Sequence, residues 1–232
     1  MWKALGQALP ERASAGWSKA VHAITAGLQP DGSRYVMFQW AGAPAGGGVE
    51  GRDGFHLIGH LITLGGLTLP NLEVYEQLYP VHFKRQELRC DSAGPGRFRG
   101  GAGADYEVEV ATPADYAYRG EGVGTPSSFG AQGGRAGIGG EVMLTLATPG
   151  PDGGRHVDGW KYGVYRFGPA TYRSLSPGGG GFGDPRTRDP ERVLRDVRDG
   201  IVSVASAERD YGVAIAADGR SIDAERTARL RA

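Results

Sequence analysis

The densest group of residues that could do chemistry lies between residues 87 and 103, in the sequence ELRCDSAGPGRFRGGAG. Arginines and acids flank a glycine turn there, and a serine follows the second acid. Guanidinium groups bind carboxylates and phosphates through paired hydrogen bonds, so this group could hold an anion. The same charges could also satisfy one another in a structural turn. The candidate residues are Glu87, Arg89, Asp91, Ser92, Arg97 and Arg99.

A second glycine loop, PGGGGFGDP at residues 177–185, has the spacing G-x-G-x-x-G. A dinucleotide-binding fingerprint follows a strand and opens a helix directly, whereas Asp184-Pro185 and four more residues separate this loop from the next helix start. No G-x-x-x-x-G-K-[ST] loop occurs in the sequence. We therefore expect an ordered structural loop here and ATP binding by another chain. The residues of this loop that could line a site are Gly178, Gly179, Gly180, Gly181 and Asp184.

His56 and His60 are four residues apart, which would place both rings on one face of a helix or a strand. Asp53 is close in sequence, and His82 and His156 could fold nearby. The glutamate of an H-E-x-x-H zinc motif is missing, however, and two histidines alone make a weak metal site. We favour histidines whose hydrogen bonds are satisfied within an apolar segment. A metal-dependent hydrolase that acts alone is the less favoured alternative.

The single cysteine, Cys90, could act as a nucleophile only if a neighbouring base lowered its pKa, and no histidine is adjacent in sequence. We expect a small buried residue at the end of a strand. No G-x-S-x-G nucleophile elbow occurs either. Nothing in these motifs predicts a serine or cysteine hydrolase.

The composition sets the context of these candidates. With 41 glycines and 14 prolines in 232 residues the chain approaches the composition of disordered proteins, but its 26 basic and 26 acidic residues balance and aromatic residues occur throughout. We expect a folded protein that depends on glycine. Zero net charge argues against nucleic-acid binding, and no apolar run is long enough to span a membrane. One cysteine fits a reducing compartment, so we expect a cytoplasmic protein.

The pattern predicts an α+β fold: mainly antiparallel β-sheet with glycine-rich loops and a short helical C-terminal tail. The first thirty residues should be helical, with Ser18 capping a helix that ends at Gly27. A glycine-rich loop follows at residues 41–54, and residues 55–69 are ambiguous between strands and a helix. Strands are expected at residues 34–40, 74–78, 81–88, 106–110, 141–147 and 160–167.

The last part of the chain has clear helix signals. Asp189-Pro190 starts a helix that stops at Gly200, and a second helix covers residues 203–211. The Asp218-Gly219 turn predicts a hairpin, and Asp223 caps a last helix. We divide the chain into an N-terminal helical segment (1–30), a β-rich and glycine-rich domain (31–186) and a helical tail with a hairpin (187–232), which together form one structural unit.

Residues 69–110 (LPNLEVYEQLYPVHFKRQELRCDSAGPGRFRGGAGADYEVEV) and 176–213 (SPGGGGFGDPRTRDPERVLRDVRDGIVSVASAERDYGV) resemble the C-terminal part of the hydantoinase B/oxoprolinase family. That family includes N-methylhydantoinase and 5-oxoprolinase subunits and large subunits of acetone and acetophenone carboxylases. The segment LPN…YEQLYPV followed by DYEVEV is nearer to the carboxylase-like branch. Ala93 stands where the family turn usually has glycine, and Phe182 stands where tyrosine is common.

The resemblance implies an ATP-dependent reaction. In such enzymes a hydantoinase A-type subunit binds ATP and phosphorylates an amide or enolate oxygen, and the B-type subunit helps to hydrolyse the ring or carboxylate the carbon. Family members are usually more than twice as long as this chain, and their N-terminal half carries residues resembling metal ligands that have no match here. The resemblance therefore implies that partner chains bind both ATP and a divalent metal, that this chain holds no metal, and that one partner carries the N-terminal half.

Two hypotheses follow. The first is a subunit of an ATP-dependent cyclic-amide hydrolase or ketone carboxylase that is inactive alone, with the residues of the two glycine loops as site wall or interface. The second is a structural or assembly module without a reacting group, whose glycine loops allow close packing against partner subunits.

Overall fold

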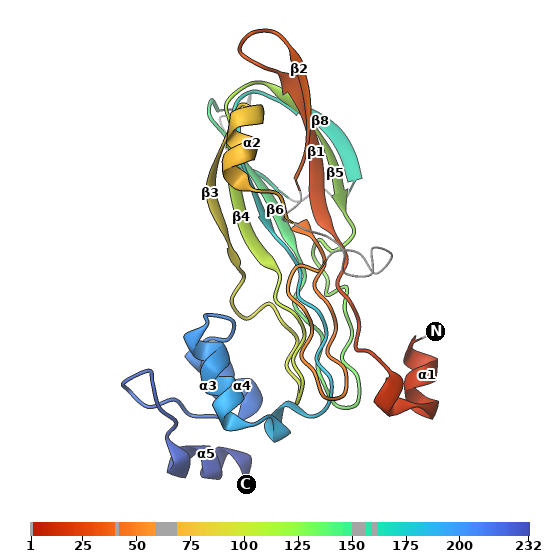
Figure 1. Ribbon diagram of the computed structural model, residues 1–232, viewed down its shortest axis with the longest axis vertical. Helices are drawn as coiled ribbons and strands as arrows, with labels where there is room; N and C mark the ends of the chain where they lie inside the picture. The colour runs from red at the N-terminus through yellow and green to blue at the C-terminus, as the bar shows by residue number, and fades with distance from the viewer. Residues whose placement is uncertain (1, 40–41, 59–68, 150–155, 159–161) are drawn as a thin grey trace.

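Two antiparallel β-sheets pack face to face and form the upper half of the molecule (Figure 1). The computed structural model describes residues 2–39, 42–58, 69–149, 156–158 and 162–232. The first sheet has the order β2-β1-β5-β8 and the second the order β3-β4-β9-β6-β7. The strands of the first sheet are β1 (Val21–Leu28), β2 (Arg34–Phe38), β5 (Ala114–Gly120) and β8 (Tyr162–Phe167). Those of the second are β3 (Val81–Leu88), β4 (Ala104–Val110), β6 (Glu141–Leu146), β7 (His156–Asp158) and β9 (Ala170–Leu175).

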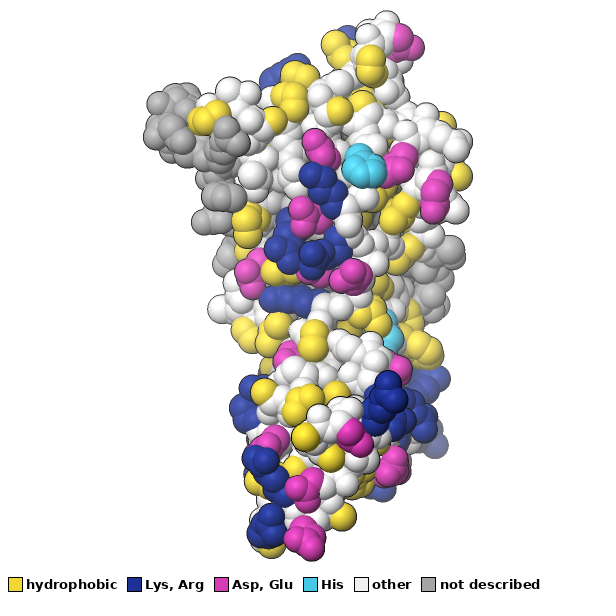
Figure 2. All heavy atoms as spheres, turned by 90° about the vertical axis from the view of Figure 1, so that its left-hand side faces the viewer, with side chains coloured by type: hydrophobic (Ala, Val, Ile, Leu, Met, Phe, Trp, Pro, Cys, Tyr) yellow, Lys and Arg dark blue, Asp and Glu magenta, His cyan; other side chains and the backbone are white. Residues whose placement is uncertain are grey.

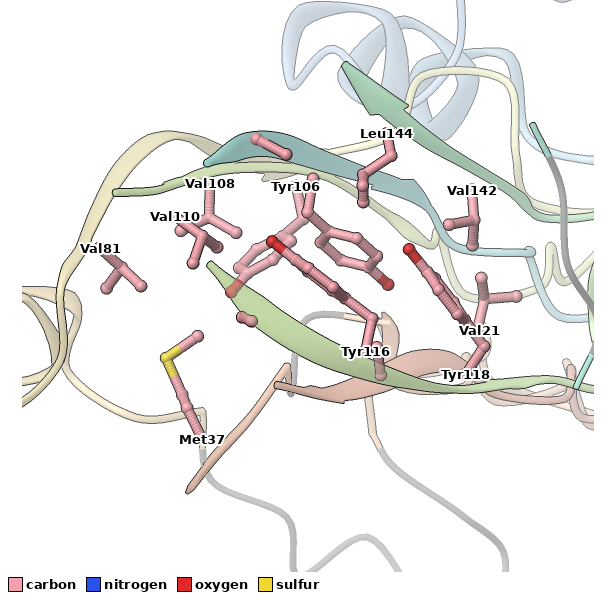
Figure 3. Packing of buried hydrophobic residues seen from close by; sticks show 14 of the residues in the cluster. Val21, Met37, Val81, Tyr106, Val108, Val110, Tyr116, Tyr118, Val142 and Leu144 are labelled. Atoms are coloured by element: carbon pink, nitrogen blue, oxygen red, sulfur yellow. The ribbon is translucent and has the colours of Figure 1, made fainter. Parts of the chain in front are cut away.

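The core between the sheets forms because inward side chains alternate with outward ones along each strand. Along β4, Tyr106, Val108 and Val110 are buried, whereas Glu107 and Glu109 point away from the core. Tyr116 and Tyr118 of the first sheet lie against the second sheet, as Figure 3 shows, and their rings approach Tyr172. A tyrosine-rich layer therefore joins the sheets.

Short helices surround the sandwich and its lower extension. Asn71 caps α2 (Leu72–Leu78) by accepting a hydrogen bond from the Val74 N–H. α1 (Trp2–Ala8) and the 3-10 turn η1 (Pro10–Arg12) begin the chain, and the turn η4 (Pro185–Thr187) leads into α3 (Pro190–Arg198), α4 (Val204–Tyr211) and α5 (Ala224–Arg231). Within the described residues, no helix has the length and hydrophobicity needed to cross a membrane.

Below the sandwich, five extended segments run side by side and connect it to the helices (Figure 1). They are neither helical nor part of the sheets, and backbone hydrogen bonds join one segment to the next. We call residues 14–20, 43–56, 92–103, 128–140 and 176–183 the glycine bundle. Segment 176–183 lies at its centre, because its N–H groups donate to carbonyls of the segments that contain Gly16, Gly101, Arg135 and Ile138.

The predicted fold class is confirmed, as are the strands within residues 34–40, 81–88, 106–110, 141–147 and 160–167 and the three tail helices. The helices have the expected caps, since Asp189, Ser203 and Asp223 each accept a hydrogen bond from the first turn, and Gly200 and Gly212 have positive φ. The predicted hairpin is reduced to a single bridge between Ile215 and Ile222. The division into residues 1–30, 31–186 and 187–232, as parts of one structural unit, stays a prediction.

Two element predictions are wrong. No helix follows Ser18; instead Val21–Leu28 is the strand β1, paired on both sides, and the Ser18 hydroxyl accepts a hydrogen bond from Ala45 N across the bundle. β-branched residues at three of these positions favour the strand. Residues 74–78 are helical instead of extended because Asn71 caps them. Most of the ambiguous segment 55–69 lies outside the described residues.

Candidate functional site

The four consecutive glycines at residues 178–181 form the axis of the bundle. A Cβ atom on Gly178 would lie 1.8 Å from the carbonyl oxygen of Ser92, and one on Gly179 would lie 2.0 Å from that of Gly46. Cβ atoms on Gly180 and Gly181 would meet Phe129 O at 2.0 Å and Pro95 O at 2.1 Å. Every position of this segment faces a neighbouring backbone, so only glycine fits, as at the crowded axis of other bundles of extended chains.

The same geometry decides whether this loop can hold a phosphate. A phosphate-binding glycine loop needs free backbone N–H groups that converge on the anion. Here the N–H groups of Gly178, Gly179, Gly180 and Gly181 donate to Ile138 O, Gly101 O, Gly16 O and Arg135 O at 2.8–3.2 Å. All four donors are occupied by carbonyls, so the G-x-G-x-x-G spacing arises from packing and does not fit a nucleotide site.

The two glycine loops singled out by their residues lie together. Gly94 donates to Gly179 O at 2.8 Å, and Phe98 and Phe182 pair as an isolated β-bridge. The stretches that carry the family resemblance therefore form one three-dimensional unit.

Three of the polar residues expected in a site wall bind backbone groups of this unit. One Arg89 Nη donates to Gly139 O at 2.8 Å and the other to Glu141 at 3.0 Å. The buried Ser92 hydroxyl donates to Arg89 O and accepts from Gly103 N. Asp91, with φ 57°, accepts from Ser203 N at 2.8 Å and so fixes the start of α4. These residues hold the turn and the tail in place.

The fourth residue, Arg99, belongs to a buried ionic cluster between the bundle and the tail. Its Nε lies 2.9 Å from Asp196 of α3. Arg188 is 1% exposed and binds Asp53 at 2.7 Å and Asp196 at 2.7 Å. Arg192 adds a contact of 2.8 Å to Asp53. Three guanidinium groups thus surround two carboxylates, and the cluster ties the helical tail to two bundle segments.

The pKa values of the cluster follow from this arrangement. Burial raises the pKa of Asp53, but the hydrogen bond and charge of Arg188, with Arg99 and Arg192, outweigh it and hold the pKa below its ordinary value. Burial lowers the pKa of Arg188, and the two carboxylates more than compensate, so its pKa is raised. Asp53 is thus held ionised to anchor arginines, which leaves it unsuited to accept a proton at neutral pH.

His56 lies at the edge of the cluster with its Nδ1 accepting a hydrogen bond from Ala102 N at 2.8 Å. Burial lowers the pKa of this imidazole, and the charge of Arg99 lowers it further, against Asp196 and Asp53. The neutral ring therefore carries its proton on Nε2, and neither nitrogen offers a free lone pair to a metal. His60 lies outside the described residues, and among the residues placed by the structure no group of three His, Cys, Asp or Glu side chains could hold a metal ion.

Cys90 is exposed, so the prediction of a buried cysteine is wrong. It follows β3, at the turn that leads to Asp91 instead of in the core. Partial desolvation raises the pKa of its thiol, and the nearby Asp91 charge adds to the increase. A thiol with a raised pKa has little thiolate at neutral pH, so it is not activated as a nucleophile.

The other predicted residues with exposed side chains are Glu87, near the end of β3, and Arg97 and Asp184, at the lower tip of the bundle. Arg97 N donates to Gly183 O at 3.1 Å, which brings the two predicted loops together at this tip. The Arg97 side chain is 55% exposed, with its nearest carboxylate at Glu50, 3.9 Å away. Arg97 and Arg192 both lie over the ring of Phe98, at 5.4 and 5.7 Å. This tip can present guanidinium groups to an anion or to a partner.

The sequence did not single out Arg188, Arg192 and Asp196. They lie in the segment RTRDPERVLRD, which has the pattern of an ordinary charged helix start. Asp53, which binds the two arginines, is more than 130 residues away along the chain. Of this cluster only Arg99 was predicted as a site residue.

The sequence profile of the family described as hydantoinase B/oxoprolinase matches residues 1–185. The chain is 36% identical over 230 residues to the caprolactamase subunit beta of Pseudomonas jessenii, covering 94% of this chain and 38% of that subunit. It is 30% identical over 194 residues to the acetophenone carboxylase delta subunit of Aromatoleum aromaticum, covering 70% of this chain and 28% of that subunit.

A solved structure agrees with these relatives. The crystal structure of the ATP-dependent caprolactamase from Pseudomonas jessenii superimposes with a TM-score of 0.80 and 30% identity, over 99% of this chain and 40% of that one. The chain thus spans well under half the length of the relatives that it matches.

Proposed function

Because this chain belongs to the hydantoinase B/oxoprolinase family, we propose that it acts in an ATP-dependent complex that hydrolyses a cyclic amide or carboxylates a ketone. The observation that carries the proposal is that the sequence likeness to the caprolactamase beta subunit extends over 94% of this chain, and the fold likeness to the ATP-dependent caprolactamase over 99%. Amide hydrolysis is favoured because this relative is more similar to the chain than the carboxylase subunit is.

In the proposed reaction the γ-phosphoryl group of ATP is transferred to the amide oxygen, water adds to the carbon that bears this oxygen, and the ring C–N bond breaks. This leaves an amine and an acyl phosphate, which a second water hydrolyses. The products are the ring-opened acid, ADP and phosphate. We place ATP on a hydantoinase A-type partner and the divalent metal on a chain that carries the rest of the family fold. Two observations support this assignment: the N–H groups of residues 178–181 are occupied, and His56 offers no lone pair.

For this chain we propose a supporting role with one accessible contact point. Arg89, Asp91, Ser92, Arg99 and the four glycines hold the bundle and tail in place, while Arg97 and Asp184 face outward to an anionic intermediate or a partner. The cytoplasmic location expected from the sequence stays part of this proposal.

The test is reconstitution. The chain alone should show no turnover, and co-expression with a hydantoinase A-type subunit and the chain carrying the rest of the family fold should give ADP release coupled to ring opening of caprolactam, hydantoin or 5-oxoproline. Bicarbonate-dependent consumption of acetophenone would identify the carboxylase instead. Turnover by the purified chain alone would contradict the proposal.

Arg97→Ala separates a site residue from an assembly module. If Arg97 faces the intermediate, the complex forms and turnover falls; if the chain only assembles, Arg97→Ala weakens the complex. Arg85→Ala is the matched control, because Arg85 is an exposed arginine with a 3.1 Å ion pair to Asp105 on the outer face of the second sheet instead of at the tip. Arg99→Ala is less informative, since Arg99 is buried and its loss would loosen the tail.

A further inference from the structure

The outer faces of the two sheets differ in chemistry. The outer face of the second sheet is charged, with Arg85 and Arg173 on Asp105 and Lys84 on Glu109 at 2.8–3.1 Å. Figure 2 shows basic and acidic side chains gathered side by side on this face. The opposite charges on this face pair with one another, so the surface is stable in contact with water.

The outer face of the first sheet is largely apolar. Val36 of β2 and Val164 of β8 are 66% and 70% exposed, and Ile24, Leu28 and Tyr162 are exposed beside them. The strand register places these residues on one surface: Ala26 pairs with Val36, Ile24 with Ala117, and Ala117 with Val164. Apolar side chains therefore run across all four strands.

The sequence of β2 is typical of a strand that is buried on both faces. β2 reads RYVMF, in which Tyr35 and Met37 point into the core and Val36 points outward. β4, in contrast, alternates cleanly between buried apolar residues and outward acids. Near-continuous apolar strands occur where both faces are covered, whereas alternating strands have one face in water. The apolar part of this face, around Val36, Ile24 and Val164, is therefore suited to being covered by a second layer.

We propose that the part of the hydantoinase B fold that lies beyond the region matched here docks on the outer face of β2-β1-β5-β8. The caprolactamase beta subunit carries about 60% of its length beyond the region matched here, and this remainder must pack somewhere on the shared unit. The inference rests on the proposed function, because it takes that remainder as the partner. The matching surface should be apolar at its centre and polar at its edge, where Arg119 and Arg166 already pair with Glu121 and Asp115 at 2.9 and 3.3 Å.

The size of the face argues against a second copy of this chain as the occupant. Four strands about 4.8 Å apart and about 20 Å long cover roughly 400 Å². A symmetric dimer through this face alone would bury about 800 Å² in total, below the roughly 1,200 Å² of a stable interface. A longer partner can add contacts outside the sheet.

Cysteine labelling tests the proposal cleanly because the chain has one cysteine. In a Cys90→Ser background, Val36→Cys and Val164→Cys are labelled with a maleimide, in the chain alone and in complex with the polypeptide that matches the rest of the caprolactamase beta subunit. If both parts belong to one longer chain, the labels are placed in that chain. We expect labelling at both positions to slow at least tenfold on assembly. Val204→Cys, an exposed valine on α4, should label at the same rate in both states.

Unchanged labelling at both positions in the complex would overturn the proposal, as would failure of the unmodified chain to bind that polypeptide. Protection that appears in the chain alone as its concentration rises would also overturn it, because the occupant would then be a second copy. The outcome is separable from the proposed function: protected cysteines without ATP-dependent turnover leave docking intact, and turnover with reactive cysteines leaves the function intact.

Discussion

The sandwich and the glycine bundle bury their chains by opposite means. In the sandwich, large side chains such as Tyr116, Tyr172 and Leu144 fill the space between the sheets. In the bundle, backbones touch one another and side chains would be in the way, since Cβ atoms on residues 178–181 would lie within 2.1 Å of carbonyl oxygens. The sandwich should therefore be weakened by removing atoms and the bundle by adding them.

The largest effect should follow from adding one methyl group to the bundle axis. Gly178→Ala places a Cβ atom 1.8 Å from Ser92 O, a backbone atom that cannot move without breaking the bundle. We expect a loss of more than about 4 kcal/mol in unfolding free energy, or no folded protein. Urea unfolding followed by circular dichroism measures this. For comparison, Leu144→Ala in the sandwich should remove about 2–5 kcal/mol by leaving a cavity.

Gly168→Ala is the matched control for this contrast. A Cβ atom on Gly168 would meet nothing within 4 Å, and its φ is not in the left-handed region. The substitution should be neutral or stabilise by about 0.4–1 kcal/mol through the unfolded state. If Gly178→Ala were as mild as Gly168→Ala, close backbone packing would not be what holds the bundle.

A smaller but still large effect should come from the cluster that joins the bundle to the tail. Arg188→Met leaves Asp53 and Asp196 without their shared partner in a buried place, and we expect about 3–5 kcal/mol of destabilisation. Arg166→Met removes an exposed ion pair and should change stability by less than about 1 kcal/mol. Urea unfolding measures both variants. If Arg188→Met were as mild as Arg166→Met, the tail would not depend on the cluster.

The sandwich was more predictable from sequence than the bundle, for a physical reason. The alternation of Tyr106, Val108 and Val110 with acids is a property of one strand, and so are the caps at Asp189 and Ser203. β5 and β9 were not predicted, and α2 was mistaken for a strand because the cap at Asn71 was not recognised. These errors occur where the local sequence pattern does not decide between a strand and another element.

The candidate site was predictable only in part, because its contacts are distant in sequence. The sequence indicated two ordered glycine loops, and the structure brings them together through Gly94 and Gly179. The sequence did not indicate that Asp53 pairs with Arg188, and it did not distinguish the buried Arg99 from the exposed Arg97. Backbone hydrogen bonds among glycines do not depend on side-chain type, so the sequence does not indicate which segments are neighbours. The neighbours of each segment follow only from the whole fold.

The smallest effect is a pH dependence that arises where the bundle meets the tail. The pKa of His56 is lowered in the folded chain, so the unfolded chain binds a proton more readily. Stability should therefore be fully present above pH about 6.5 and decrease as the pH falls from there to the folded pKa of His56, with a slope of at most about 1.4 kcal/mol per pH unit. Asp53, whose pKa is also lowered, contributes a separate loss only below pH about 3.8.

His56→Asn should remove this slope, because the asparagine Oδ1 can accept the Ala102 N–H in place of Nδ1 without binding a proton. His82→Asn, on the exposed end of β3, is the control and should leave the slope in place. Urea unfolding at pH 5.0 to 8.0 measures all three proteins. If the slope survives in His56→Asn, the proton that destabilises the fold binds to another group. The acid sensitivity would then not arise at residue 56, because the hydrogen bond from Ala102 N to the asparagine Oδ1 is made equally well at every pH.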